Sequence, residues 1–216
     1  MMIKAITLLL ILAGAFSAAH AQDASVGEKS SATCSGCHGI AGYQSSFPEV
    51  FRVPKIAGQN AAYIVAALTA YRKGERRHPT MRAIGGGLTD QAMADLAAYY
   101  EQKGSALVKT VADSTPPAPP SAVAELLTRG ACATCHGANF NKALVPAYPK
   151  LAGQYADYLF ASLRAYGTEG NPHVGRANAV MSGQVKPFKR SELKAMADYI
   201  ASLPGDLRLV PNPKFK

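Results

Sequence analysis

Tryptophan is absent from this 216-residue chain, and stretches rich in β-branched residues are few. Alanine is abundant and leucines recur at spacings of three and four, which predicts helices and leaves no pattern for a parallel sheet. After the first 21 residues, no apolar stretch approaches the roughly 20 residues needed to cross a bilayer. The sequence therefore predicts an all-α protein whose main body contains no membrane-spanning segment.

The first 21 residues have the composition of an export signal. Lys4 precedes an apolar run over residues 6–16, and Ala19 and Ala21 form a small-x-small cleavage site. We expect cleavage after Ala21, which makes residues 1–21 a signal peptide and places the mature chain in the periplasm. An uncleaved membrane anchor is the alternative.

Acidic residues are scarce, with 14 against 23 lysines and arginines, and the mature chain keeps a formal net charge of +8. Long-range attraction of this kind mainly speeds encounter with oppositely charged partners. Outside the cytoplasm we expect these partners to be anionic proteins or membrane headgroups rather than nucleic acid. Peripheral association with a membrane is one form such contact would take.

A proline-rich segment divides the mature chain into two similar halves. Residues 112–122 contain four prolines and no large apolar residue, which predicts an extended linker between domains at 22–111 and 123–216. The motif PKIAGQ, which begins at Pro54, returns as PKLAGQ at Pro149, 95 positions later. We expect each half to run through a short helix, a cysteine pair, a long loop, a helix, a loop with a methionine and a last helix.

Both halves contain two helices with an apolar face. The earlier helix places apolar residues at i, i+4 and i+7, as in Ile64, Leu68 and Tyr71. A glycine follows this helix in each half as its expected end, namely Gly74 and Gly167. The last helix of each half is expected to begin at a capping residue, namely Thr89 and Ser191.

All four cysteines lie in two copies of one motif, CSGCHG and CATCHG. The first copy contains Cys34, Cys37 and His38, and the second contains Cys132, Cys135 and His136. A thioredoxin-like motif would follow a strand of a parallel sheet, which has no pattern here. Paired cysteines of a zinc site are normally separated by about 15–20 residues, far fewer than the distance between these two copies. Disulfides suit an exported protein, but they leave both histidines unexplained.

The spacing C-x-x-C-H is instead the attachment signature of c-type haem. Two cysteines three apart reach the two vinyl groups on one edge of the porphyrin, and the adjacent histidine then lies under the iron as its proximal ligand. Two covalently attached haems c, one in each half, are therefore predicted.

A methionine follows each motif at a matched distance. Met81 lies 43 residues after His38, and Met181 lies 45 residues after His136. A thioether ligand favours ferrous iron and raises the potential, as in electron-transfer cytochromes c. We expect Met81 and Met181 to be the sixth ligands, which would also exclude a substrate from the iron.

The remaining methionines and histidines offer weaker candidates. Met93 and Met196 fall on the core faces of the last helices, where packing is their expected role. His78 is three residues from Met81 and is the rival ligand in the first half, while His173 is the less well matched rival in the second.

Taken in order, the motifs CSGCHG, PKIAGQ, Met81 and LAAYY, with their counterparts in the second half, resemble the dihaem cytochromes c4. The resemblance spans nearly all of the mature chain. It implies two tandem class I cytochrome c domains related by a pseudo-twofold axis. It also implies that the carbonyls of Pro54 and Pro149 accept hydrogen bonds from the proximal histidines. The second half departs from the family pattern in two places. The segment that precedes its cysteines is shorter, and the loop between Gly167 and Met181 is longer than its counterpart in the first half.

The same resemblance implies a periplasmic carrier that shuttles single electrons between redox proteins, toward a terminal oxidase or a membrane cytochrome complex, and is not an enzyme. The alternative is the electron-accepting subunit of a dehydrogenase complex, such as a sulfide-oxidising flavoprotein. Independent catalysis is disfavoured because related thiosulfate-oxidising enzymes place a further cysteine on iron, and this chain has none to spare. A basic segment around the first methionine predicts either a docking rim for an acidic partner or counter-charges for haem carboxylates; its members are Arg72, Lys73, Arg76, Arg77 and Arg82.

Overall fold

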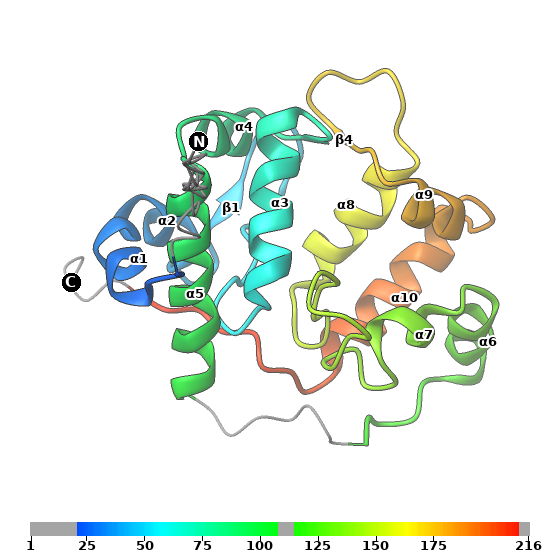
Figure 1. Ribbon diagram of the computed structural model, residues 1–216. Coiled ribbons are helices and arrows are strands. Elements are labelled where there is room, and N and C mark those ends of the chain that lie inside the picture. The colour runs from blue at the N-terminus through cyan, green and yellow to red at the C-terminus, as the bar shows by residue number, and fades with distance from the viewer. Residues whose placement is uncertain (1–20, 108–114, 212–216) are drawn as a thin grey trace, which may run out of the picture.

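The computed structural model describes residues 21–107 and 115–211 (Figure 1). The predicted signal peptide, apart from Ala21, lies outside these residues, as does the start of the predicted linker. In the part of the chain that the structure describes, no helix is both long and apolar enough to span a membrane. Helices dominate and each strand is only two residues long, which confirms the all-α prediction.

The helices of the two halves follow the same order. The first half contains α1 (Ala24–Ser30), α2 (Ala32–His38), β1 (Gln44–Ser45), β2 (Phe51–Arg52), α3 (Ala61–Lys73), β3 (Arg76–Arg77), α4 (Pro79–Gly86) and α5 (Asp90–Leu107). The second contains α6 (Ser121–Arg129), α7 (Cys132–His136), α8 (Ala156–Tyr166), β4 (Gly175–Arg176), α9 (Ala179–Val185) and α10 (Arg190–Ser202). Because α6 begins at Ser121, the last two residues of the expected linker belong to this helix.

Local capping explains where several helices begin and end. Helix α3 ends at Gly74, whose φ of 77° lies in the left-handed region that glycine adopts without strain, and α8 ends before Gly167. The side-chain oxygen of Thr89 accepts a hydrogen bond from the amide of Ala92 at 3.1 Å. The predictions at these three positions are confirmed.

The predicted N-cap of the last helix is wrong. Helix α10 begins at Arg190, so Ser191 lies inside its first turn. The carboxylate of Glu192 accepts a hydrogen bond from the amide of Lys189 at 2.6 Å. This bond satisfies an amide at the helix end and stabilises a start two residues earlier than expected.

The segments that contain Met81 and Met181 are short helices rather than loops. Pro79 occupies the first turn of α4, where its missing N–H costs nothing. At the start of α9, the side-chain oxygen of Asn178 accepts a hydrogen bond from the amide of Met181 at 2.9 Å. A cap at each start therefore orders a segment that has too little apolar periodicity to be recognised as a helix.

Each half has its own hydrophobic core, built from the helix faces predicted above. In the first half α3 and α5 contribute Ile64, Leu96 and Tyr100. In the second half the buried side chains come from α8, α9, α10 and the loops beside them, and they include Leu159, Leu193, Met196, Ile200 and Leu203. Met93 has no exposed surface and Met196 retains 3%, so the prediction that both pack in the core is confirmed.

The two halves also share backbone contacts. Strands β3 and β4 pair across the halves, with Arg76 opposite Arg176. The last described residues, red in Figure 1, run from the second half back to the first. There the amide of Arg208 donates to the carbonyl of Ala57 at 2.9 Å, and Val210 joins the core of the first half. The last residues of one half thus help to complete the core of the other.

Candidate functional site

The first cysteine motif forms helix α2. Cys34 and Cys37 lie three residues apart, so they are neighbours on one side of the helix, and Cys34 packs against the core of the first half. All four cysteines of the chain are free thiols. Burial raises the pKa of Cys34 and of Cys132, whereas the nucleophilic cysteines of redox motifs have a lowered pKa.

His38 ends helix α2 with its ring held in one orientation. Its Nδ1 lies 2.7 Å from the carbonyl oxygen of Pro54. Because a carbonyl can only accept, Nδ1 carries the proton and Nε2 keeps a lone pair. Burial lowers the pKa of His38, which favours this neutral ring. A neutral imidazole whose other nitrogen is hydrogen-bonded is the usual form of a metal-binding histidine.

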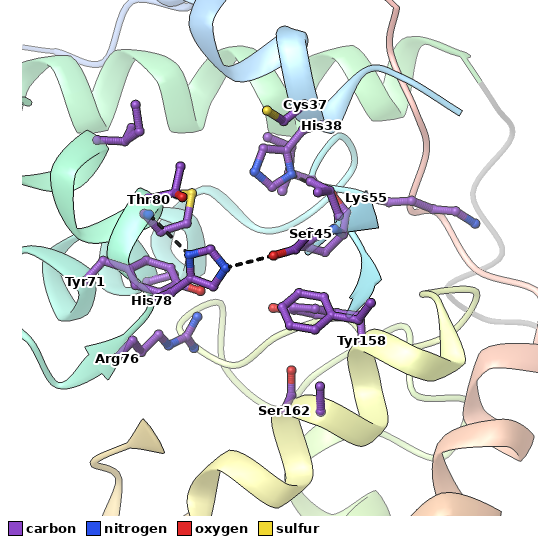
Figure 2. A pocket seen from close by; sticks show the side chains of 18 of the residues that line it. Cys37, His38, Ser45, Lys55, Tyr71, Arg76, His78, Thr80, Tyr158 and Ser162 are labelled. Carbon is purple, nitrogen blue, oxygen red and sulfur yellow. Dashed lines mark hydrogen bonds between the residues drawn. The ribbon is translucent and has the colours of Figure 1, made fainter. Parts of the chain in front are cut away.

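A cavity of about 590 Å³ lies beside this motif, within the size range of ligand pockets. Cys34, Cys37, His38 and Met81 all line it, together with apolar side chains such as Ile64, Leu68, Ile84 and Leu96. Figure 2 shows His38 pointing into the space between the helices of the first half and Tyr158 of α8. The structure thus brings all four predicted residues of the first half to one cavity.

His78, the rival ligand, has both ring nitrogens facing protein groups (Figure 2). Its Nδ1 accepts from the amide of Met81 at 3.4 Å, as the cap of α4. Its Nε2 then carries the proton and faces the hydroxyl oxygen of Ser45, also at 3.4 Å. This arrangement, in which both ring nitrogens face protein groups, favours Met81 over His78 as the candidate ligand.

The second motif has the same arrangement around its histidine. Nδ1 of His136, at the end of α7, lies 3.2 Å from the carbonyl oxygen of Pro149. Burial lowers the pKa of His136, as it does in the first half. The contacts of both prolines implied by the resemblance are therefore present.

Met181 and Cys132 pack against one hydrophobic cluster of the second half, which contains Leu193 and Met196. The chain therefore gathers a cysteine of the motif and the matched methionine on the same core. His173 lies elsewhere. It is exposed, and its ring packs on Phe47 of the first half with centroids 5.4 Å apart.

Two arginines line the cavity from both halves. Nη2 of Arg76 donates to the hydroxyl of Tyr63 at 3.0 Å, and Nη2 of Arg176 donates to the hydroxyl of Tyr158 at 3.1 Å. Both guanidinium groups are half-buried and border the cavity. Among the described residues, neither lies within salt-bridge distance of a carboxylate. Such a pair of cations suits the carboxylates of a bound group.

The basic segment predicted as one rim is therefore divided. Arg72 forms an ion pair with Asp90 at 2.6 Å, and Nη1 of Arg77 donates to the carbonyl of Asn171 at 2.9 Å. Arg76 and Arg77 both line the cavity, but in the described part of the chain only Arg77 of this pair has its side chain held by a backbone carbonyl of the second half. Arg176 was not identified from the sequence as a residue of the site. A signal was present, because Tyr63 and Tyr158 are 95 residues apart, as the repeated motifs are, and Arg76 and Arg176 follow them in the two halves.

The residues present fit a covalently attached haem. They supply two thiols one turn apart, a neutral histidine with a free nitrogen, a thioether, an apolar cavity and two cations for carboxylates. Each is a type of group that a c-type haem requires.

Comparison with known proteins agrees with this fit. The Cytochrome c family model matches residues 24–102 and 121–204. Cytochrome c4 of Azotobacter vinelandii is 30% identical over 218 residues, covering 93% of this chain and 99% of that protein. The thiosulfate dehydrogenase electron acceptor of Stutzerimonas stutzeri is 30% identical over 179 residues, covering 79% of this chain and 78% of that protein.

Among solved structures, reduced recombinant cytochrome c4 from Pseudomonas stutzeri superimposes with a TM-score of 0.63 at 28% identity, covering 85% of this chain and 100% of that one. The family match extends over most of the chain and occurs twice. The chain therefore belongs to the dihaem cytochrome c4 family, as two cytochrome c domains with two covalently attached haems c.

Proposed function

We propose that this electron-transfer cytochrome holds its haems through the residues of the two motifs. Cys34 and Cys37 form thioethers to one haem, and Cys132 and Cys135 to the other. His38 and His136 are the proximal ligands, and Met81 and Met181 are the sixth ligands. The observation that carries this assignment in the first half is the cavity lined by Cys34, Cys37, His38 and Met81, in which the proline carbonyl leaves Nε2 of His38 free for iron. In the second half the assignment is supported by the contact of His136 with Pro149 and by the packing of Cys132 and Met181 on one cluster.

The proposed ligands favour electron transfer over catalysis. When bound, each haem supplies a one-electron Fe(III)/Fe(II) couple. The soft sulfur of methionine raises the potential of this couple and occupies the position at which a substrate would bind. Arg76 and Arg176 are the counter-charges that we assign to the haem carboxylates. They border the cavity from opposite halves, and this position supports the proposal that electrons pass near them between two domains at residues 22–111 and 123–216.

The partners we propose are redox proteins of the periplasm. The chain would be exported by its first 21 residues, cleaved after Ala21, and would pass single electrons toward a terminal oxidase or a membrane cytochrome complex. The formal net charge of +8 that remains after this cleavage supports an acidic docking surface on the partner or an anionic membrane surface.

The test is oxidation of the purified, reduced protein by membranes that contain the terminal oxidase. We expect fast oxidation coupled to cyanide-sensitive oxygen uptake, and a rate that falls as salt screens the charges. The inactive control is the same membrane preparation with cyanide. Slow oxidation that does not depend on salt would contradict this proposal.

A second function is supported by the similarity to a thiosulfate dehydrogenase electron acceptor over 79% of the chain. In that case the chain would accept electrons from a dehydrogenase, such as a thiosulfate dehydrogenase or a sulfide-oxidising flavoprotein. Stable copurification of such an enzyme, with reduction of both haems by its substrate, would decide for this function.

A further inference from the structure

The geometry points to Gln154 as a residue that tunes the haem held by His38, and to Gln59 as the residue that tunes the haem held by His136. Each glutamine acts on the proximal histidine of the other half, through one peptide group. This inference rests on the proposed function, because it takes His38 and His136 as the iron ligands. We call each of these two chains of contacts a crossed relay. It leads from the proximal histidine to the proline carbonyl, through the peptide group to the amide of the following lysine, and from there to the glutamine of the other half.

The first crossed relay runs through the peptide group between Pro54 and Lys55. Its carbonyl oxygen faces Nδ1 of His38 at 2.7 Å. The N–H of the same peptide group, on Lys55, donates to Oε1 of Gln154 at 3.0 Å. One rigid, conjugated amide therefore joins the histidine of the first half to a side chain of the second.

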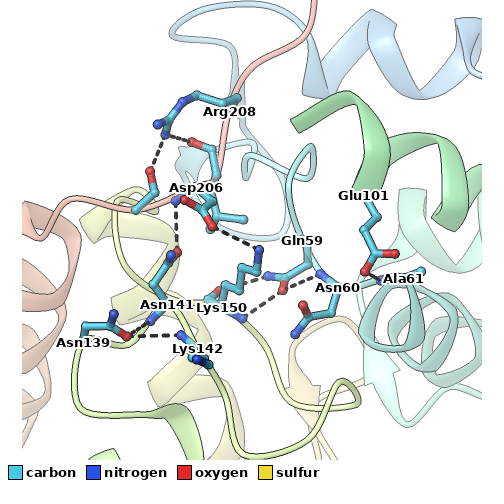
Figure 3. Close-up of polar contacts among 12 residues, drawn as sticks. Gln59, Asn60, Ala61, Glu101, Asn139, Asn141, Lys142, Lys150, Asp206 and Arg208 are labelled. Atoms are coloured by element: carbon cyan, nitrogen blue, oxygen red, sulfur yellow. Dashed lines mark hydrogen bonds and ion pairs between the residues drawn. The ribbon is translucent and has the colours of Figure 1, made fainter. Parts of the chain in front are cut away.

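The second crossed relay repeats this arrangement with the halves exchanged. The carbonyl of Pro149 faces Nδ1 of His136 at 3.2 Å. The N–H of Lys150 donates to Oε1 of Gln59 at 2.8 Å, a contact visible in Figure 3. The two relays are thus related by the same pseudo-twofold symmetry as the halves.

Both glutamines are held so that the oxygen faces the lysine amide. Nε2 of Gln154 donates to the carbonyl of Lys55 at 2.9 Å, and Nε2 of Gln59 donates to the carbonyl of Lys150 at 2.9 Å. With two hydrogen bonds to one residue, the side-chain amide cannot rotate without losing both. Each glutamine is only 5% exposed, so bulk water does not compete for these bonds.

The effect of the relay on iron follows from the polarity of the amide. An acceptor on the N–H side pulls the peptide proton and increases electron density on the carbonyl oxygen, because hydrogen bonds in a chain strengthen one another. A more negative oxygen holds the Nδ1 proton more strongly and makes the imidazole a stronger donor to iron. Stronger donation favours the ferric state, so an intact relay lowers the potential of the haem in the opposite half.

The test replaces each glutamine in turn and follows the two haems separately. Gln154→Met keeps the side-chain length but removes the acceptor for the Lys55 amide. Gln59→Met is the equivalent change in the second relay. Each haem is followed during a redox titration by the methyl resonance of its axial methionine, assigned with Met81→His and Met181→His. The control is Asn60→Ala, which removes another bond between the halves, from Nδ2 to the carbonyl of Tyr148 at 3.0 Å. The backbone amide of residue 60, which donates to Oε1 of Gln59 at 3.0 Å, is kept in this variant, so no bond of either relay is removed.

We expect a crossed result. Gln154→Met should raise the potential of the haem at His38, and change its ferric-to-ferrous ratio at fixed potential on the order of two- to tenfold, the range for one hydrogen bond. Gln59→Met should do the same for the haem at His136. Asn60→Ala should leave both ratios close to those of the unchanged protein.

Gln154→Glu distinguishes an effect of the relay from a general loosening of the contacts between the halves. Its carboxylate is a stronger acceptor for the Lys55 amide, although it cannot donate to the Lys55 carbonyl as the amide of Gln154 does. It should therefore lower the potential of the haem at His38, opposite in sign to Gln154→Met. Equal shifts of both haems, a larger shift in the half that carries the substitution, or no shift would each overturn the relay. Failure of a methionine signal to vanish in its own histidine variant would instead contradict the sixth ligands. The relay would then be decided by a visible redox titration of the glutamine variants in chains that keep one haem, made by Cys132→Ala with Cys135→Ala or by Cys34→Ala with Cys37→Ala.

Discussion

Replacement of Cys34 and Cys37 by alanine is expected to remove half of the covalently bound haem. Both thiols lie on one side of α2 and line the same cavity, and the chain offers no other cysteine within the first half. Without them the haem of that half would lose both thioether bonds. Mass spectrometry of the denatured protein should then find one haem per chain instead of two.

The matched control is the same change in the second motif. Cys132→Ala with Cys135→Ala should also leave one haem, and all four substitutions together should leave none. Two haems retained in either double variant would contradict the assignment of one motif to each haem.

The second large effect is expected from Met81→His. Imidazole is a harder ligand than a thioether and stabilises ferric iron, so the potential of the first haem should fall. Axial ligands spread haem potentials over ~0.8 V, and we expect a decrease on the order of 0.2 V within that range. A redox titration followed by visible spectroscopy should show one shifted haem, one unshifted haem and half of the ferric methionine–iron band.

Met93→Leu provides the control from the same half. Met93 has no exposed surface, and its sulfur lies 3.8 Å from the hydroxyl of Thr69. A volume-conserving change in the core usually costs less than about 1.5 kcal/mol, so both potentials and the full band should remain. Loss of the band in Met93→Leu, or an unchanged potential in Met81→His, would show that the wrong methionine has been assigned.

Candidate residues for these sites could be named from the sequence because their chemistry restricts the sequence locally. Thioether attachment needs two cysteines at one spacing with the histidine beside them, and this pattern is readable without any knowledge of the fold. The distance to Met81 and Met181 could be read for a similar reason, because both halves repeat it. The helical faces of Ile64 and Leu193 followed from their periodicity.

The contacts between the halves could not be predicted in this way. Gln59 and Lys150 are 91 residues apart, and a single hydrogen bond at that distance has no periodic signal. Strands β3 and β4 are two residues long, which is too short for an alternating pattern. The return of Val210 to the core of the first half likewise depends on tertiary packing. The interface that we expect to tune the haems is therefore the part that required the structure.

The measurement that tests the account most directly is a redox titration of the unchanged protein followed by visible spectroscopy, with carbon monoxide added to the reduced form. Two one-electron steps at positive potential, the ferric methionine–iron band and no binding of carbon monoxide are the predicted result. That result would mean that both irons carry histidine and methionine and serve only to carry electrons. A haem that binds carbon monoxide readily, or that titrates far lower without the methionine band, would contradict the account and indicate an iron open to substrate or a different sixth ligand.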